Sequence, residues 1–183
     1  MSKQTTISNP ISLSGVGIHT GKKVELNFKP APENHGYAFC RSDLDGNPII
    51  EADANLVVNT QRGTNLKKNG VSIQTCEHVL AALVGLEIDN VLIELNAPEP
   101  PIMDGSSKFF VEALLKAGIM EQDAERYEYV VHENITYTDE ETGSEITVIP
   151  ADEYQVTTMV DFGTKVLGTQ NASLKHLSEF KDD

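Results

Sequence analysis

The apolar residues between positions 75 and 118 constrain the fold most, because their spacing changes from helical to strand-like and back. The first helix is predicted to begin near Thr75, whose hydroxyl suits an N-cap, and to end at Gly85. Its apolar face consists of Cys76, Val79, Leu80 and Leu83.

A second helix is predicted after the turn-forming stretch Pro100–Ser106, and Gly118 ends it. Its apolar face consists of Phe109, Phe110, Ala113, Leu114 and Ala117. Between the two helices, alternation over Asn90–Asn96 predicts a strand with Val91, Ile93 and Leu95 on one side.

The first seventy residues have the pattern of short strands separated by turns. Ile7–Leu13 is interrupted by Asn9-Pro10, and Ser14–Gly21 is a glycine-rich, hairpin-like stretch. Val24, Leu26 and Phe28 alternate with polar residues, which predicts a half-buried strand. The remaining predicted strands are Tyr37–Cys40, as an antiparallel partner of that strand, and short strands within Ile49–Val58 and Thr64–Ile73.

The polar stretch 121–127 is interpreted as a linker, after which a strand-rich pattern resumes. The strands expected there are Tyr129–Ile135, Glu145–Ile149 and Gln155–Phe162, with a helix start over Ser173–Phe180. Because Val24–Ala31 resembles Ser144–Ala151, a duplicated β-rich half is predicted. The fold class is therefore α+β: a two-layer α/β sandwich over residues 1–122, and the incomplete start of a similar domain over residues 123–183.

Charge and composition exclude several classes of protein. The formal net charge of −14 argues against general binding to nucleic acid or to an anionic membrane, since both need clustered positive charge. The longest apolar run, Val79–Val84, is too short to cross a bilayer. Cys40 and Cys76 form no CxxC motif, and without a signal-peptide pattern they indicate reduced thiols in the cytoplasm.

The pair Glu77-His78 is the sharpest candidate for chemistry. Both residues fall in the first turn of the first predicted helix, where the helix dipole stabilises a carboxylate and disfavours an imidazolium. A neutral imidazole can ligate a metal while the neighbouring carboxylate reaches a metal-bound water. The alternative is an ordinary helix start, because the other histidines show no ligand spacing to His78 and a catalytic zinc needs three protein ligands.

Three other segments could approach a ligand, and each also has a simpler interpretation. His19 lies between Gly17 and Gly21 in a loop that could equally be a plain hairpin turn. Arg62 within Asn59–Thr64 could contact an anion, or could be a solvated loop arginine. Asp104 could be a buried acid, although a helix N-cap is favoured, and Cys76 is interpreted as a core residue.

Taken together, several segments resemble the UDP-3-O-acyl-N-acetylglucosamine deacetylase family, LpxC. The matching stretches cover nearly all of residues 3–120 and are Gly15–Gly21, Lys29–Pro32, Thr75–Leu83, Gly85–Asn90 and Asn96–Ser106. The resemblance implies two similar α/β sandwiches with the active cleft between them and a catalytic Zn²⁺. It also implies that His78 is the first zinc ligand and Glu77 the general base in hydrolysis of an N-acetyl group during lipid A biosynthesis.

The resemblance further implies which parts of the site lie elsewhere. Two zinc ligands and a catalytic histidine belong to the rest of the second domain, so residues 1–183 alone are expected to be inactive, and His176 does not match any of them. The residues expected to flank metal and UDP-sugar lipid precursor are Ile18, His19, Thr20, Thr60 and Gly63. Some similar proteins are fused to a 3-hydroxyacyl-carrier-protein dehydratase. The alternatives from other classes are a non-catalytic sugar-nucleotide-binding module and a purely structural interaction domain.

Overall fold

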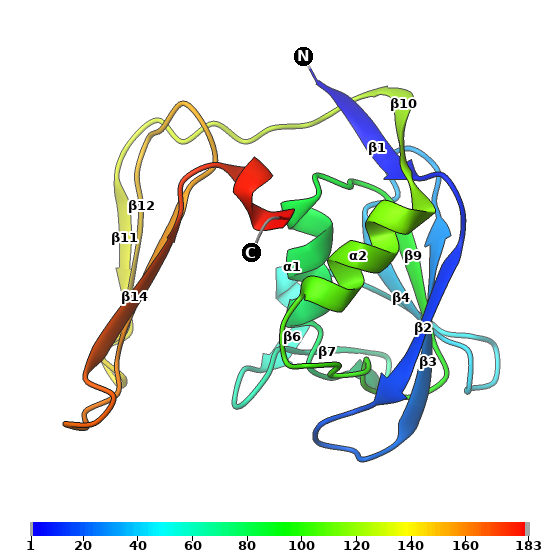
Figure 1. Cartoon of the computed structure of the whole chain (residues 1–183), viewed down its shortest axis with the longest axis horizontal. Helices are drawn as coiled ribbons and strands as arrows, with labels where there is room; N and C mark the ends of the chain where they lie inside the picture. The colour runs from blue at the N-terminus through cyan, green and yellow to red at the C-terminus, as the bar shows by residue number, and fades with distance from the viewer. Residues whose placement is uncertain (1, 182–183) are drawn as a thin grey trace. The chain divides into compact units, whose positions relative to one another are not determined.

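The chain divides into two compact units, Met1–Arg126 and Tyr127–Asp183, and a computed structural model describes residues 2–181 within them (Figure 1). The first unit contains both α-helices, α1 (Glu77–Gly85) and α2 (Lys108–Ala117). Its strands are β1 (Lys3–Ile7), β2 (Ile11–Val16), β3 (Lys23–Pro30), β4 (Tyr37–Arg41), β5 (Ile49–Glu51), β6 (Val57–Asn59), β7 (Asn65–Lys68), β8 (Val71–Ile73), β9 (Val91–Leu95) and β10 (Ile119–Glu125).

A five-stranded sheet in the order β2-β3-β9-β4-β5 forms one layer of this unit. Val24, Leu26 and Phe28 of β3 are buried, as their alternation predicts. The predicted antiparallel pairing of Tyr37–Cys40 with β3 is wrong, because β9 lies between the two strands and β4 runs parallel to β9. The apolar strand β9 takes the central place, where β3 and β4 pair with its two edges and Val91, Ile93 and Leu95 are buried.

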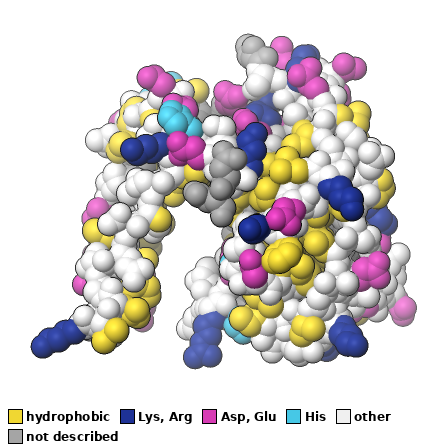
Figure 2. All heavy atoms as spheres, viewed as in Figure 1, with side chains coloured by type: hydrophobic (Ala, Val, Ile, Leu, Met, Phe, Trp, Pro, Cys, Tyr) yellow, Lys and Arg dark blue, Asp and Glu magenta, His cyan; other side chains and the backbone are white. Residues whose placement is uncertain are grey.

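The two helices form the second layer and lie against one face of the sheet (Figure 1). Phe110 of α2 packs edge-on against Phe28 of β3, with ring centroids 6.4 Å apart. The predicted two-layer α+β sandwich is therefore confirmed for the first unit. Phe109 was expected on the buried face of α2 but is 38% exposed. Figure 2 shows hydrophobic side chains gathered on one face of the first unit. No helix among residues 2–181 is long and apolar enough to cross a bilayer.

Two smaller sheets complete the first unit. Strands β6, β7 and β8 form a three-stranded meander that follows the short 3₁₀ turn Ala54–Leu56. Strands β1 and β10 pair antiparallel, so most of the predicted linker 121–127 is in fact a strand. The sequence did not predict this strand because β10 is largely exposed and polar, and its pairing depends on a partner more than a hundred residues earlier in the chain.

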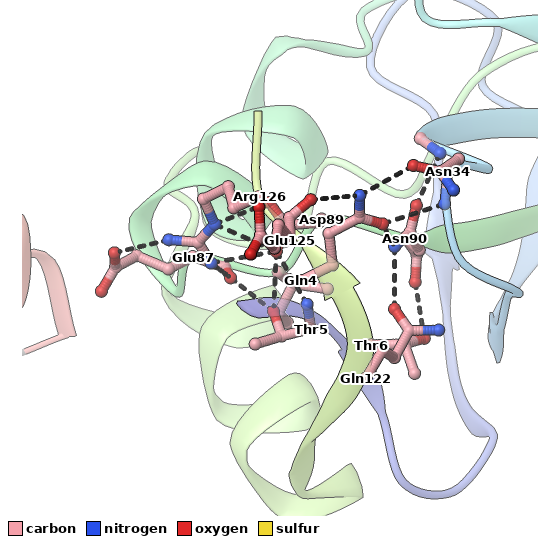
Figure 3. A network of polar contacts seen from close by, with 12 residues as sticks. Gln4, Thr5, Thr6, Asn34, Glu87, Asp89, Asn90, Gln122, Glu125 and Arg126 are labelled. Atoms are coloured by element: carbon pink, nitrogen blue, oxygen red, sulfur yellow. Dashed lines mark hydrogen bonds and ion pairs between the residues drawn. The ribbon is translucent and has the colours of Figure 1, made fainter. Parts of the chain in front are cut away.

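A set of amides, of which Gln4 and Asn90 are buried and Gln122 is half-buried, joins the β1–β10 pair to the main sheet (Figure 3). The Asn90 amide nitrogen donates to the side-chain oxygens of Gln4 and Gln122, both at 2.8 Å, and its oxygen accepts from the Gly36 N–H. The Gln122 amide nitrogen in turn donates to the Ala31 carbonyl at 3.0 Å. Because each amide is satisfied on both its oxygen and its nitrogen, these polar groups stay buried without an unpaired donor or acceptor.

Arg126 closes the first unit with a forked contact to the loop after α1 (Figure 3). Its Nε and Nη2 bind the Asp89 carboxylate at 2.9 Å each, and its Nη1 binds Glu87 at 3.0 Å. The flat guanidinium suits this two-pronged geometry, which a lysine would not reproduce. The first unit thus ends at Arg126, whereas the sequence placed the boundary after residue 122.

The second unit contains two separate antiparallel hairpins followed by a 3₁₀ turn. The hairpins are β11 (Ile135–Thr138) with β12 (Glu145–Val148), and β13 (Val156–Asp161) with β14 (Thr169–Leu174). The predicted strand Tyr129–Ile135 is wrong except at its last residue, and the predicted helix start is the 3₁₀ turn Leu177–Lys181. None of the described residues of this unit is buried, and isolated two-stranded hairpins are at best marginally stable in water.

Candidate functional site

Glu77 and His78 are the first two residues of α1, as the sequence predicts. Thr75 is not the N-cap: Cys76 takes that position, and no side chain caps the helix there. Thr75 instead has a positive φ of 52°, which is rare and costly for a β-branched residue. This sharp turn brings the chain from β8 into α1 directly at the Glu77-His78 pair.

The Glu77 carboxylate faces the loop that joins β6 to β7. Its Oε2 accepts a hydrogen bond from the Thr64 N–H at 2.8 Å. His78 is half-buried, so it is not enclosed in the apolar core, and its backbone carbonyl accepts from the Ser107 hydroxyl at 2.9 Å. The structure therefore holds both residues at one place, between the β6–β7 loop and the segment leading into α2.

Gly63 permits the close approach of this loop to the helix start. Its φ is 151°, and a Cβ at this position would lie 3.2 Å from the Thr75 hydroxyl and 3.4 Å from Glu77 Oε1. The preceding residue, Arg62, also has a positive φ of 61°. A side chain at position 63 would thus meet an unfavourable backbone conformation and a tight contact at once.

We expect Gly63→Ala to destabilise the first unit by about 1–3 kcal/mol, because the alanine must adopt a positive φ and its Cβ also crowds the Thr75 hydroxyl and the Glu77 carboxylate. The matched control is Gly70→Ala in the β7–β8 turn, where φ is also positive but a Cβ would meet nothing within 4 Å. Urea unfolding followed by circular dichroism at 222 nm measures both. An equal decrease in the free energy of unfolding for the two variants would contradict the crowding at Gly63.

The glycine-rich loop between β2 and β3 also approaches the start of α1, where Glu77 and His78 lie. The His19 Nε2 donates to the Arg62 carbonyl at 2.9 Å, which joins this loop to the β6–β7 loop. The backbone N–H groups of His19 and Thr20 both donate to the carboxylate of Glu99. His19, Thr20 and Gly63 are thereby brought near Glu77, while Ile18 and Thr60 are exposed on the same two loops.

The remaining predicted candidates do not join this group. Asp104 is exposed, so it is no buried acid, and it is not the N-cap of α2 either, because Ser107 holds that position. Asp104 instead accepts from the N–H and hydroxyl of Ser106. Cys76 is buried in the core as predicted, and burial, with a smaller effect of Glu77, raises the pKa of its thiol to about 12.

The described residues do not by themselves form a zinc site. No group of three or more His, Cys, Asp or Glu side chains among residues 2–181 could hold a metal. A catalytic zinc takes three protein ligands, so His78 could supply only one of them. Two open surface hollows of about 430 and 460 Å³ lie beside Ser14–Val16, and neither is lined by Glu77 or His78.

Glu99 is the contact residue that the sequence did not single out. It is fully buried, and it binds both the His19–Thr20 backbone and the Thr75 hydroxyl. A charged residue between Pro98 and Pro100 suggests an exposed loop, because ionised side chains are rarely buried. Only the tertiary contacts reveal that hydrogen-bond donors from two distant segments converge on it.

Comparison with known proteins identifies the family of this chain. The family model described as LpxC, UDP-3-O-acyl N-acetylglycosamine deacetylase, matches residues 4–183. The chain is 44% identical over 183 residues to the bifunctional enzyme LpxC/FabZ of Bacteroides thetaiotaomicron, covering 100% of this chain and 40% of that protein. It is 47% identical over 169 residues to the UDP-3-O-acyl-N-acetylglucosamine deacetylase of Hahella chejuensis, covering 91% of this chain and 55% of that protein.

A third relative, the bifunctional enzyme LpxC/FabZ of Chlorobaculum tepidum, is 47% identical over 176 residues, covering 96% of this chain and 38% of that protein. The chain therefore spans roughly two fifths to just over half of the length of these relatives. Because the family model spans nearly the whole sequence, the chain belongs to the UDP-3-O-acyl-N-acetylglucosamine deacetylase family, LpxC.

Proposed function

We propose that this chain contributes the base and one metal ligand to a zinc-dependent deacetylase. The reaction is hydrolysis of the N-acetyl group of UDP-3-O-acyl-N-acetylglucosamine, giving the free amine and acetate, within lipid A biosynthesis. The observation that carries the proposal is the junction at the start of α1, where Glu77 and His78 meet the His19 and Gly63 loops. Family membership supplies the substrate class.

Glu77, His78 and the neighbouring loops each have a separate role in the proposed hydrolysis. Glu77 accepts the proton of the attacking water as that water adds to the acetamide carbonyl. His78 would be the one zinc ligand from this chain, and a bound zinc would lower the pKa of the water and polarise the carbonyl. The loops with Ile18, His19, Thr20, Thr60 and Gly63 flank the substrate. The two buried free cysteines suit a reducing compartment, and we place the protein in the cytoplasm.

The whole protein, expressed with zinc, is expected to release acetate from UDP-3-O-acyl-N-acetylglucosamine. Residues 1–183 alone, assayed with added zinc, are expected to show no turnover, because the described residues hold no three-ligand metal group. Absence of acetate release by the whole protein would contradict the proposal. Turnover by residues 1–183 at a comparable rate would contradict the proposal that this chain supplies only one of the zinc ligands.

Substitution of His78 separates a zinc enzyme from a binding module without zinc. In the whole protein, His78→Ala is expected to lower zinc occupancy after dialysis, because a zinc site that loses one of three ligands binds far more weakly. The matched control is His35→Ala, which removes a ring that hydrogen-bonds to the neighbouring Gly36 carbonyl. Zinc content is measured by elemental mass spectrometry, and unchanged zinc in His78→Ala would exclude His78 as a ligand.

A further inference from the structure

Glu99 is buried without a cation beside it. Its side chain has no exposed surface, and none of the ion pairs formed by the described side chains includes it. Burying a carboxylate in this way is unfavourable unless hydrogen bonds replace its lost hydration. The residues that supply those hydrogen bonds therefore indicate what the carboxylate is there to hold.

Within residues 2–181, the donors to Glu99 come from two segments next to Glu77 and His78. The His19 N–H lies 3.1 Å from both carboxylate oxygens, and the Thr20 N–H and hydroxyl each lie 2.9 Å from Oε2. The Thr75 hydroxyl donates to Oε1 at 2.9 Å. Burial raises the pKa of Glu99, but these hydrogen bonds together outweigh it and hold the pKa below its usual value. The carboxylate is consequently ionised at neutral pH.

The two segments fit around the carboxylate in different ways. Thr75 has a left-handed backbone conformation that a β-branched residue avoids, and such a conformation persists only where the surroundings fix it. Two contacts fix it here: the Asn65 side-chain oxygen on its N–H and Glu99 on its hydroxyl. In the other segment, Gly17 leaves room for the carboxylate, since a Cβ there would lie 2.4 Å from Glu99 Oε2.

We propose that Glu99 is a positioning residue, whose buried carboxylate fixes the His19–Thr20 loop against the strained Thr75 turn that presents Glu77 and His78. It touches no reacting atom in this role. Its importance for catalysis rests on the proposed deacetylase function, whereas its role in holding the two segments together does not. A glutamine is the same size but has one accepting oxygen in place of two, so it cannot accept from all the His19, Thr20 and Thr75 donors at once.

The structural part is tested by amide hydrogen exchange, followed by NMR, in the 183-residue chain. In Glu99→Gln, the His19 and Thr20 amides are expected to exchange at least about tenfold faster, because a single side-chain oxygen then remains to accept from the donors of both segments. The Leu26 and Ile93 amides of the central sheet should stay protected, which shows that the fold is intact. The matched control is Glu94→Gln, which removes an ion pair with Lys29 on a neighbouring strand.

A second variant keeps the test decisive if Glu99→Gln fails to fold. Thr75→Val has the same shape but removes the hydroxyl, so it breaks only the link between Glu99 and the Thr75 turn. It is expected to accelerate exchange at the Thr75 and Thr64 amides while those of His19 and Thr20 stay protected. Unchanged exchange at all four amides in both variants, or wild-type exchange at His19 and Thr20 as fast as in an unfolded peptide, would overturn the proposal.

The catalytic part is tested in the whole protein by steady-state acetate release. Glu99→Gln is expected to lower kcat by about 10²-fold, the scale for a small misplacement of catalytic groups, with Glu99→Asp recovering part of the loss and Glu94→Gln unchanged. If the wild type does not turn over, the proposed function fails while the exchange data still decide the role of Glu99. Full activity of Glu99→Gln in an active protein would overturn the positioning role.

Discussion

Replacing Glu77 by glutamine in the whole protein is expected to lower kcat by about 10²–10⁴-fold, the usual contribution of a general base, with zinc content unchanged. Glutamine is the right replacement because its side-chain oxygen can still accept from the Thr64 N–H, which Glu77 Oε2 does at 2.8 Å. The loop geometry is then kept and only the proton-accepting capacity is removed. Steady-state acetate release and elemental analysis of zinc measure the two quantities separately.

The control for this substitution is Glu112→Gln, which removes a carboxylate from the exposed side of α2 and should leave kcat unchanged. A non-catalytic sugar-nucleotide-binding module would behave differently, because substrate binding by Glu77→Gln would persist and no turnover would exist to lose. If Glu77→Gln retained most of the wild-type kcat, Glu77 could not be the base. Loss of zinc in the same variant would instead make Glu77 a metal ligand.

Removing the Phe110 ring is expected to cause a large loss of stability, about 3–5 kcal/mol for Phe110→Ala. The ring is 1% exposed and packs edge-on against Phe28 of β3, so its removal opens a cavity between the helix layer and the sheet. Phe109→Ala is the matched comparison, since this neighbour on the same helix is 38% exposed. It is expected to cost less than about 1.5 kcal/mol, because less apolar area returns to water.

Circular dichroism at 222 nm during urea unfolding measures both variants and reports on the first unit, since both α-helices of residues 2–181 lie there. Similar losses for the two phenylalanines would contradict the packing of α2 on the sheet. A small decrease in the free energy of unfolding for Phe110→Ala would mean that the helices shift to fill the cavity left by the ring.

Much of the fold was predictable wherever periodicity or turn chemistry acts locally. The limits of α2, the stop of α1 at Gly85, the alternation along β3 and β9, and the place of Glu77-His78 at a helix start all follow from neighbours in the sequence. These features depend on contacts within a few residues, so a single sequence carries the information that specifies them.

Other features depend on which distant segments meet, and local patterns carried no signal for them. The pairing of β10 with β1, the insertion of β9 between β3 and β4, and the exposure of Phe109 beside the buried Phe110 are of this kind. Glu99 shows the difference most clearly. From its sequence it is a charged residue between prolines, and in the fold it is a buried acceptor for two loops.

The sequence by itself determined the α+β class, the two helices, the family resemblance and the Glu77-His78 pair, because periodicity and short motifs encode these directly. Only the tertiary structure decided that the buried Glu99 joins the His19–Thr20 loop to the Thr75 turn beside that pair. The physical reason is that a buried polar group must find its hydrogen-bond partners wherever the folded chain places them, and their identity is set by long-range packing.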